Sequence, residues 1–311
     1  MLAEKANKAE NMERAEDAVQ KHRSNVPKKN HFESVKVRKR IKTIVILIIL
    51  SLGSILLLSP IWWMFATSVK SMGEIMTYPP TIWPNEWHLE NYFETWKAAP
   101  FARYTLNTLF ITALTVFASV LSNSFIAYGF AKIKFKGRKV LFSLLLATMM
   151  LPGFVTLIPQ YVLFSQLGWL NTYLPLIVPH FFGGAFFVFL LRQFYMTIPN
   201  ELLEAAKIDG GSHFYIWRKI ILPLSKPAIA TVAIFSFNGA WNDFLGPLLY
   251  VNEESLYTLQ IGLQVFKGQI ATQWNYMMAG SLLVILPVII LFFIFQRYFI
   301  EGMNLTAGSK G

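Results

Sequence analysis

Five long apolar runs constrain what this chain can fold into, because a helix crosses a bilayer core about 30 Å thick with roughly 20 apolar residues. Four of the runs contain no Asp, Glu, Lys or Arg, and the fifth contains only Asp243. One run is long enough for two helices joined at a turn. The sequence therefore predicts an all-α, polytopic membrane protein with six transmembrane helices, from the runs 43–66, 104–131, 140–191, 227–252 and 268–296.

The composition agrees with lipid as the main solvent. Only 14% of the 311 residues are charged, against about 25% in a typical soluble domain. The first apolar run follows a polar segment and is longer than the roughly 7–15 residues of a signal-peptide core. We therefore expect an uncleaved first span.

The positive charges predict the orientation. Of the 28 Lys and Arg residues, 24 fall in alternate segments: 12 before the first run, five after the second, five in 192–226 and two after the last. Because short cytoplasmic segments collect Lys and Arg, both termini are expected in the cytoplasm. The net charge of +11 is then explained by topology, and no nucleic-acid partner is needed.

The runs and charges together predict the organisation of the chain. The parts are a polar cytoplasmic tail (1–42), a first transmembrane helix (43–66), an extracytoplasmic loop (67–103), a five-helix core (104–300) and a cytoplasmic tail (301–311). The N-terminal tail is compatible with a short surface helix or with disorder, and no function follows from it. The turn within the double run is placed at 168–172, which contains Gly, Trp and Asn.

The cytoplasmic loop 192–226, called the EAA loop below, is long enough to suggest a function. Helix signals predict two short helices in it, at 201–209 and 213–222. Asn200 begins the first helix and Ser212 caps the second, whereas Gly210 makes a turn with positive φ and Pro223 ends the second helix.

The EAA loop carries a spaced motif, EAA-x3-G-x9-I-x-LP, which consists of Glu204, Ala205, Ala206, Gly210, Ile220, Leu222 and Pro223. The motif resembles the EAA loop of ATP-binding-cassette (ABC) importer permeases. The resemblance implies that these residues form a coupling helix that lodges in a groove of an ATPase subunit. An amphipathic helix on the membrane surface is the alternative, and it does not explain the full spacing.

The residue types suit that role. The small Ala205 and Ala206 would let a partner approach the helix closely, and Glu204 offers one charge for pairing. Gly210 permits the sharp turn between the two helices. The remaining motif residues, Ile220, Leu222 and Pro223, would anchor the second helix under span five.

Further segments resemble the sugar-importing branch, and most closely the smaller six-span permease of maltose-type importers. They are 107–109, 127–131, 237–244 and 296–302, with similarity also in the C-terminal tail. The resemblance implies a heterodimer with a second permease in a prokaryotic cytoplasmic membrane, two ATPase subunits that bind ATP and Mg, and an extracytoplasmic sugar-binding protein. The expected cargo is a carbohydrate; a polyol or glycerol phosphate is the alternative.

Asp243 is the candidate for substrate contact, since an acid within a membrane span is commonly functional. Asn238, Trp241 and Asn242 lie beside it in sequence, and sugars favour aromatic faces and amide hydrogen bonds. Helix capping or packing between subunits is the alternative interpretation. His180 in span four is interpreted as a packed residue rather than as a proton relay.

The sequence indicates no chemistry and no cofactor bound by this chain. It has no Cys, its five His are scattered, and it lacks both a zinc-binding HExxH motif and a phosphate-binding GxxxxGK[ST] loop. The rival classes are an ion-coupled secondary carrier and an intramembrane enzyme. Neither an internal repeat nor a catalytic constellation supports them.

Overall fold

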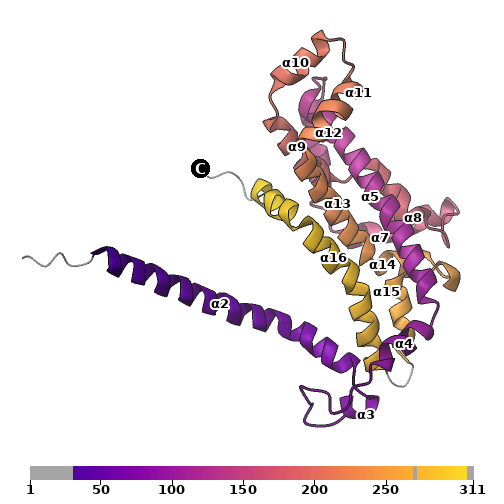
Figure 1. The fold of residues 1–311 in the computed structure, drawn as a ribbon. Coiled ribbons are helices and arrows are strands. Elements are labelled where there is room, and N and C mark those ends of the chain that lie inside the picture. The colour runs from indigo at the N-terminus through magenta and orange to yellow at the C-terminus, as the bar shows by residue number, and fades with distance from the viewer. Residues whose placement is uncertain (1–30, 269–271, 307–311) are drawn as a thin grey trace, which may run out of the picture. The chain divides into compact units, whose positions relative to one another are not determined.

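The computed structural model describes residues 31–268 and 272–306, and it describes their side chains between 39 and 296. Throughout these residues the secondary structure is helical, apart from one isolated β-bridge between Lys267 and Thr272. The described chain separates into two compact units whose boundary lies at Trp62 and Trp63, within the first long helix. Each unit is considered by itself (Figure 1).

The helices longer than one turn follow one another along the chain with short connections. Their bounds are α2 His31–Ser68, α4 Glu90–Lys97, α5 Phe101–Lys132, α6 Arg138–Thr148, α7 Gly153–Gln166, α9 Ala185–Thr197, α10 Asn200–Ile208, α13 Lys226–Trp241, α14 Leu245–Tyr250 and α16 Trp274–Thr306. The one-turn elements between them are α3 Met72–Ile75, α8 Leu174–Ile177, η1 Val178–Phe182, α11 His213–Ile216, η2 Trp217–Ile221, α12 Leu222–Leu224, η3 Glu254–Leu256, α15 Leu259–Gly262 and η4 Leu263–Phe266.

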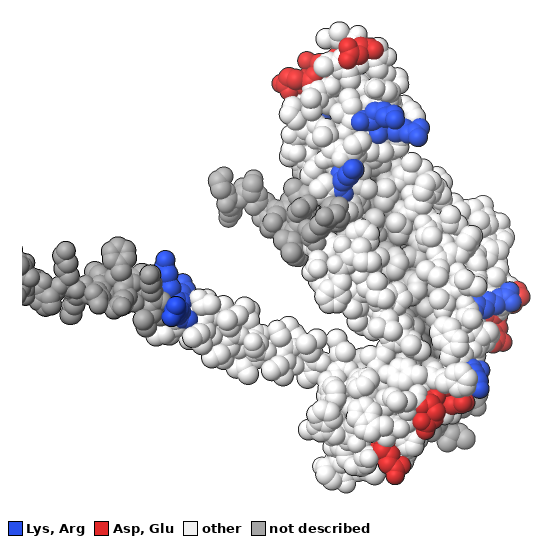
Figure 2. Space-filling view, in the orientation of Figure 1, with Lys and Arg blue, Asp and Glu red and all other residues white. Residues whose placement is uncertain are grey.

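The predicted six-span, all-α fold is confirmed. Four helical segments of the described chain are long and apolar enough to cross a membrane: Lys39–Ser68, Phe101–Lys132, Leu174–Thr197 and Trp274–Gln296. Two bent helix pairs bring the candidate spans to as many as six: α6 with α7 at 97°, and His213–Leu224 with α13 at 83°. On the face shown in Figure 2, a broad band of unit 2 without charged side chains separates charged groups near its two ends.

Both terminal helices exceed their predicted limits. α2 begins at His31, inside the segment expected to be a polar tail, and α16 continues to Thr306, past the expected end of the core at residue 300. The reason is that adding residues to a helix already nucleated by the apolar run costs far less than starting a new one. The predictions for 1–30 and 307–311 fall outside the described residues.

The double run contains the expected turn and one unexpected break. Gly168 and Asn171 adopt φ of 68° and 58° between α7 and α8, which places the turn where it was predicted. Asn171 also accepts hydrogen bonds at Oδ1 from the backbone N–H groups of Asn252 (3.1 Å) and Glu253 (2.9 Å). The break lies before Pro152, which has no N–H for a helical bond and disfavours a helical residue before it.

Span four is broken as well, and α5 supplies the hydrogen bonds that the break requires. The chain leaves the helix at Gly183, whose φ is 82°. The N–H of Gly184 donates to Asn123 Oδ1 (2.7 Å), while Ser122 Oγ donates to the carbonyl of His180 (3.1 Å). Since lipid offers no partners, such a break depends on polar side chains of a neighbouring helix.

The run 227–252, expected to form the fifth span, is interrupted where Asp243 was singled out. α13 ends at Trp241 and α14 starts at Leu245, so Asp243 lies in the connection rather than within a helix. Its Oδ1 accepts a hydrogen bond from the N–H of Gly246 (3.0 Å), in the manner of a helix N-cap. The capping interpretation is therefore met in the structure.

The loop 67–103 is an ordered structure in unit 2. Lys70 is buried and donates to the carbonyl of Thr81, while Glu74 accepts from Thr81 Oγ1 (2.8 Å) and from the N–H of Asn85 (3.0 Å). Burial favours a raised pKa for Glu74, but these hydrogen bonds and Lys70 outweigh it and hold the pKa below its usual value. Its extracytoplasmic position stays a prediction.

The break at Gly183 gives a stability test. A Cβ there would lie 2.6 Å from Ile126 Cδ1, and the backbone conformation (φ 82°, ψ 157°) is essentially confined to glycine, at a cost of about 1–3 kcal/mol for an L residue. Gly183→Ala is expected to lower the free energy of unfolding by about that amount. Gly129→Ala is the control, since a Cβ on this helical glycine meets nothing within 4 Å, and it should be neutral or stabilising. Thermal unfolding of the detergent-solubilised protein measures both; equal midpoints for the two variants would contradict the expectation.

Candidate functional site

The first half of the EAA loop folds as its capping signals predict. α10 begins after Pro199 and ends before Gly210, whose φ is 81°. Ser212 then caps α11, with its Oγ accepting from the N–H of Tyr215 (3.2 Å). Gly211 is held close to the first helix, because a Cβ there would lie 2.6 Å from the carbonyl oxygen of Ala206. The two helices are therefore joined by a tight, defined turn.

The second helix does not end at Pro223, and that prediction was wrong. α11, the π-turn η2 and α12 form one continuous segment through Leu224. In the π-turn the N–H of Leu222 bonds to the carbonyl of Trp217, five residues back. Proline lacks an N–H, so a local widening of the helix just before it accommodates the missing bond. The chain bends at Ser225 instead.

The motif residues divide into an outward and an inward set. Glu204 and Ala205 are exposed, whereas Ala206 is buried against the rest of the chain. The small side chain of Ala206 therefore serves internal packing, and a close approach of a partner to it stays a prediction. Ile220 and Leu222 are half-buried and pack on the core as expected, while Pro223 is exposed.

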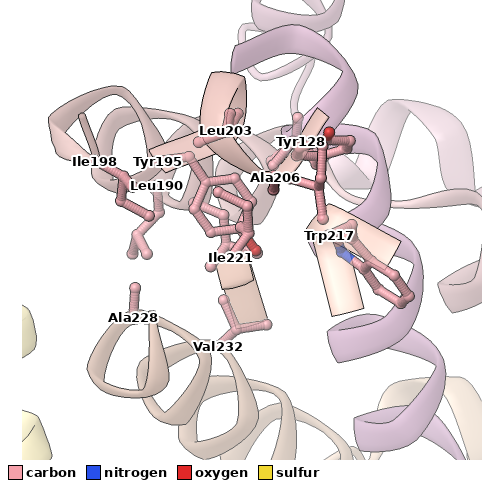
Figure 3. Packing of buried hydrophobic residues seen from close by; sticks show 14 residues of the cluster. Tyr128, Leu190, Tyr195, Ile198, Leu203, Ala206, Trp217, Ile221, Ala228 and Val232 are labelled. Atoms are coloured by element: carbon pink, nitrogen blue, oxygen red, sulfur yellow. The ribbon is translucent and has the colours of Figure 1, made fainter. Parts of the chain in front are cut away.

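An apolar cluster fixes the EAA loop to the membrane helices (Figure 3). The loop contributes Ile198, Leu203, Ala206, Ile216, Trp217 and Ile221. The membrane helices contribute Ala127, Tyr128, Val188, Leu190, Leu191, Tyr195, Ala228 and Val232, from α5, α9 and α13. Full burial of one large aliphatic side chain stabilises by about 1.5–3 kcal/mol, so the cluster contributes much of what holds the loop on the membrane helices.

Two polar contacts at the rim of this cluster join α5 to the EAA loop. Lys132, the last residue of α5, donates from Nζ to the carbonyl of Ile198 (2.6 Å) and to Asn200 Oδ1 (2.9 Å). The hydroxyl of Tyr128 lies 3.0 Å from His213 Nδ1 and forms a hydrogen bond with it, which is the second of the two contacts. Sequence reasoning used Lys132 only for topology, because nothing in the sequence links it to residues so distant along the chain.

The opposite side of the EAA loop presents apolar side chains to the surroundings. Ile208 is 87% exposed, and Leu202, Phe214 and Tyr215 are also exposed. Acidic residues lie at the same end of unit 2 (Figure 2), including the exposed Glu204 and Asp209. Exposed apolar residues grouped in this way, with charges at their edge, are typical of a protein interaction site.

The candidate substrate residues do not form one surface. Trp241 is buried, donates from Nε1 to the carbonyl of Val284 (3.0 Å) and stacks on Phe237 at 5.5 Å. It is therefore not available to stack on a sugar. Asn238 and Asn242 are exposed and hydrogen-bonded to each other (3.1 Å). Asp243 is separated from them and lines a cavity.

That cavity has a volume of about 300 Å³ and lies at the end of α13 that is farther from the EAA loop. The breaks in spans four and five both contribute to it, through His180 and Asp243 respectively. Ser236 and Thr258 also line it, and the sequence analysis singled out neither, because isolated hydroxyl residues carry no signal of a site. Within the described part of the chain, no group of three or more metal-ligating side chains occurs.

Comparison with known proteins identifies the family. Residues 123–304, more than half of the chain, match the model of the binding-protein-dependent transport system inner membrane component family. The arabinooligosaccharides transport system permease protein AraQ of Bacillus subtilis (strain 168) is 33% identical over 261 residues, which are 83% of this chain and 92% of AraQ. The sn-glycerol-3-phosphate transport system permease protein UgpE of Brucella abortus (strain 2308) is 34% identical over 266 residues, 82% and 94% of the two chains.

A crystal structure supports the fold. It is that of a bacterial ABC transporter involved in the import of the acidic polysaccharide alginate, and one of its chains matches with a TM-score of 0.74. The match covers 84% of this chain and 98% of that chain at 24% identity. Together with the spans and the folded EAA loop, these similarities exclude a secondary carrier or an intramembrane enzyme. The chain belongs to the binding-protein-dependent transport system inner membrane components, the non-catalytic permease subunits of ABC importers.

Proposed function

We propose that this permease imports a carbohydrate and is driven by ATPase subunits that grip its EAA loop. The observation that carries the proposal is that the two sides of that loop have different surroundings. One side is fixed to α5, α9 and α13 by the apolar cluster, and the other presents Ile208 and its exposed apolar neighbours. A force applied to the exposed side is therefore transmitted to three membrane helices.

The proposed assembly contains this chain, a second permease, two ATPase subunits and an extracytoplasmic sugar-binding protein. ATP and Mg are bound by the ATPase subunits. In this proposal both termini and the EAA loop lie on the cytoplasmic side, and the distribution of Lys and Arg supports that orientation. The loop 67–103 then faces outward, and the core extends over 104–300 with tails at 1–42 and 301–311.

In the proposed mechanism the ATPase dimer closes on ATP and moves the docked α10. Glu204, Ala205 and Gly210 lie on the docking side. Ala206, Ile220 and Leu222 hold the loop to the bundle, and Pro223 lies just before the bend at Ser225. The bundle then passes from inward-open to outward-open and receives cargo from the binding protein. ATP shifts this equilibrium only by its difference in affinity for the two states.

The cargo class rests on the relatives. AraQ is named for arabinooligosaccharides and UgpE for sn-glycerol-3-phosphate, so sugars and glycerol phosphate are the two candidates. Uptake of a panel of radiolabelled arabinooligosaccharides, other oligosaccharides and sn-glycerol-3-phosphate by the assembled importer decides between them. We expect ATP-dependent uptake of a sugar; a system that transports only the phosphate would contradict this choice.

The turn of the EAA loop provides the first test of coupling. Gly210 has open space around its Cβ position and a φ of 81°, so Gly210→Trp places a large ring on the docking side and strains the turn. We expect the variant to insert in the membrane but to lose uptake and co-purification with the ATPase subunits.

Gly137→Trp is the matched control, because Gly137 has a φ of 83° and equally open surroundings in the loop between α5 and α6. It is expected to retain most of the uptake. Normal transport by the Gly210 variant, or equal losses in both variants, would contradict the role of the EAA loop.

The contact between Lys132 and the start of α10 provides the second test. Lys132→Met removes the two hydrogen bonds from the ammonium group, each worth about 1.5–3 kcal/mol when the donor is charged. We expect uptake to fall several-fold while ATP hydrolysis by the complex continues, and Lys132→Arg to restore part of the uptake. The control is Lys136→Met, an exposed lysine of the same loop. Parallel losses of hydrolysis and uptake would argue against a coupling role.

A further inference from the structure

The short helix α4 has its polar side chains buried and its apolar side chains exposed. Asn91 and Thr95 are only 5% and 1% exposed. Leu89, which precedes the helix, Phe93 and Trp96 are 62%, 59% and 41% exposed and are called the apolar face below. A helix on a surface that faces water has the reverse pattern, with its apolar residues toward the protein. The surroundings of the apolar face are therefore expected to be apolar as well.

The buried face of α4 is held by hydrogen bonds to the first and the last long helix. Asn91 Nδ2 donates to the carbonyls of Ser68 and Lys70 (both 2.9 Å), at the end of α2 and just after it. Asn91 Oδ1 accepts from Asn275 Nδ2 (3.3 Å), and Thr95 Oγ1 donates to a backbone carbonyl in the first turn of α16 (3.3 Å). These bonds satisfy the buried polar groups within the chain and fix which side of α4 points outward.

The third face of α4 is charged. At about 100° per residue, Glu90, Glu94 and Lys97 fall between the apolar face and the buried face, and all three are exposed. Lys97 Nζ lies 3.9 Å from the centroid of the Phe93 ring, at the border between the charged and the apolar faces. A helix with an apolar face and a charged face is typical of one that lies in the interface between a bilayer and water.

The place of α4 beside the membrane spans agrees with such an interface. Only residues 98–100 separate it from the span that starts at Phe101. It also packs beside the beginning of the last span, Trp274–Gln296, where a Cβ on Gly280 would lie 3.2 Å from Thr95 Cγ2 (Figure 1). Since a span begins where the apolar core of the bilayer begins, α4 lies at the depth of the lipid headgroups.

We propose that α4 is an interfacial helix whose apolar face inserts into the lipid bilayer while its charged face remains in water. Lipid fits better than a protein partner, because Trp is enriched at bilayer interfaces and Lys beside an apolar face can keep its charge in water. Through Asn91 and Thr95 the helix then holds the ends of α2 and α16 at the membrane surface. The proposal depends neither on the cargo nor on the EAA loop.

Site-directed spin labelling tests the proposal, and the chain is suited to it because it contains no Cys. Phe93→Cys on the apolar face and Glu94→Cys on the charged face are each labelled in the assembled importer, in vesicles of phosphatidylethanolamine and phosphatidylglycerol. Collision of the label with oxygen, which concentrates in the bilayer, is compared with collision with a water-soluble nickel chelate. We expect the ratio of oxygen to nickel collisions to be severalfold higher at 93 than at the matched control position 94.

The importer with the unmodified chain, treated in the same way, gives the background from cysteines of other subunits. The pair Leu89→Cys and Glu90→Cys repeats the comparison one turn earlier, in case a label at 93 or 94 prevents assembly. Equal access of the nickel chelate to both faces would place the apolar face in water and overturn the proposal. A label on the apolar face that is shielded from both reagents would show that a protein subunit covers it, and would overturn the proposal too. Neither result would affect the proposed import function, because the measurement reports the surroundings of α4 and not transport.

Discussion

The apolar cluster between the EAA loop and helices α5, α9 and α13 is the interaction on which the rest of this permease depends. α10 has nine residues, fewer than the roughly 12–15 that an isolated helix needs to be even marginally stable in water. Its shape and position therefore come from the burial of Leu203 and Ala206 and from the lysine that holds its first turn. Because the same contacts order the loop and connect it to the bundle, the loop has no folded state that is independent of the membrane helices.

The cavity beside Asp243 arises from the interruptions in the membrane helices. Span four breaks at η1 and span five breaks after α13, and the two breaks bring His180 and Asp243 to one cavity. Continuous helices in these places would present only side chains of a regular face. The breaks are tolerated because neighbouring groups satisfy the freed backbone, as Asn123 does for Gly184 and Asp243 does for Gly246.

Much of the architecture was predictable from local features of the sequence. The apolar runs predicted six spans, and Gly210, Ser212 and the 168–172 turn were located by their own conformational preferences. The continuous helix through Pro223 was not predictable, because the π-turn at Trp217–Ile221 just before it has no recognised sequence signal. The burial of Ala206 and Trp241 also escaped prediction. A motif gives residue types and their spacing, but which side of a short helix is buried depends on tertiary contacts.

For the cavity beside Asp243, the sequence singled out both Asp243 and His180 but did not show that they lie in the same cavity. Residues from different spans meet only in the folded bundle. Ser236 was not identified for a different reason. Hydroxyl side chains in membrane helices usually bond to the carbonyl one turn back, as Ser281 does, and only the structure distinguishes such satisfied groups from orphans.

The bond between Asn123 and Gly184 has a consequence for how the bundle moves. Separating α5 from the broken span would expose a backbone N–H and an amide to an apolar medium, at a cost of several kcal/mol for each group. That cost is comparable to the whole free-energy gap between two functional conformations, which is commonly a few kcal/mol. The second and fourth spans are therefore expected to move as one rigid body. The helices that shift against one another in the transport cycle must then meet at surfaces other than the contact between these two spans.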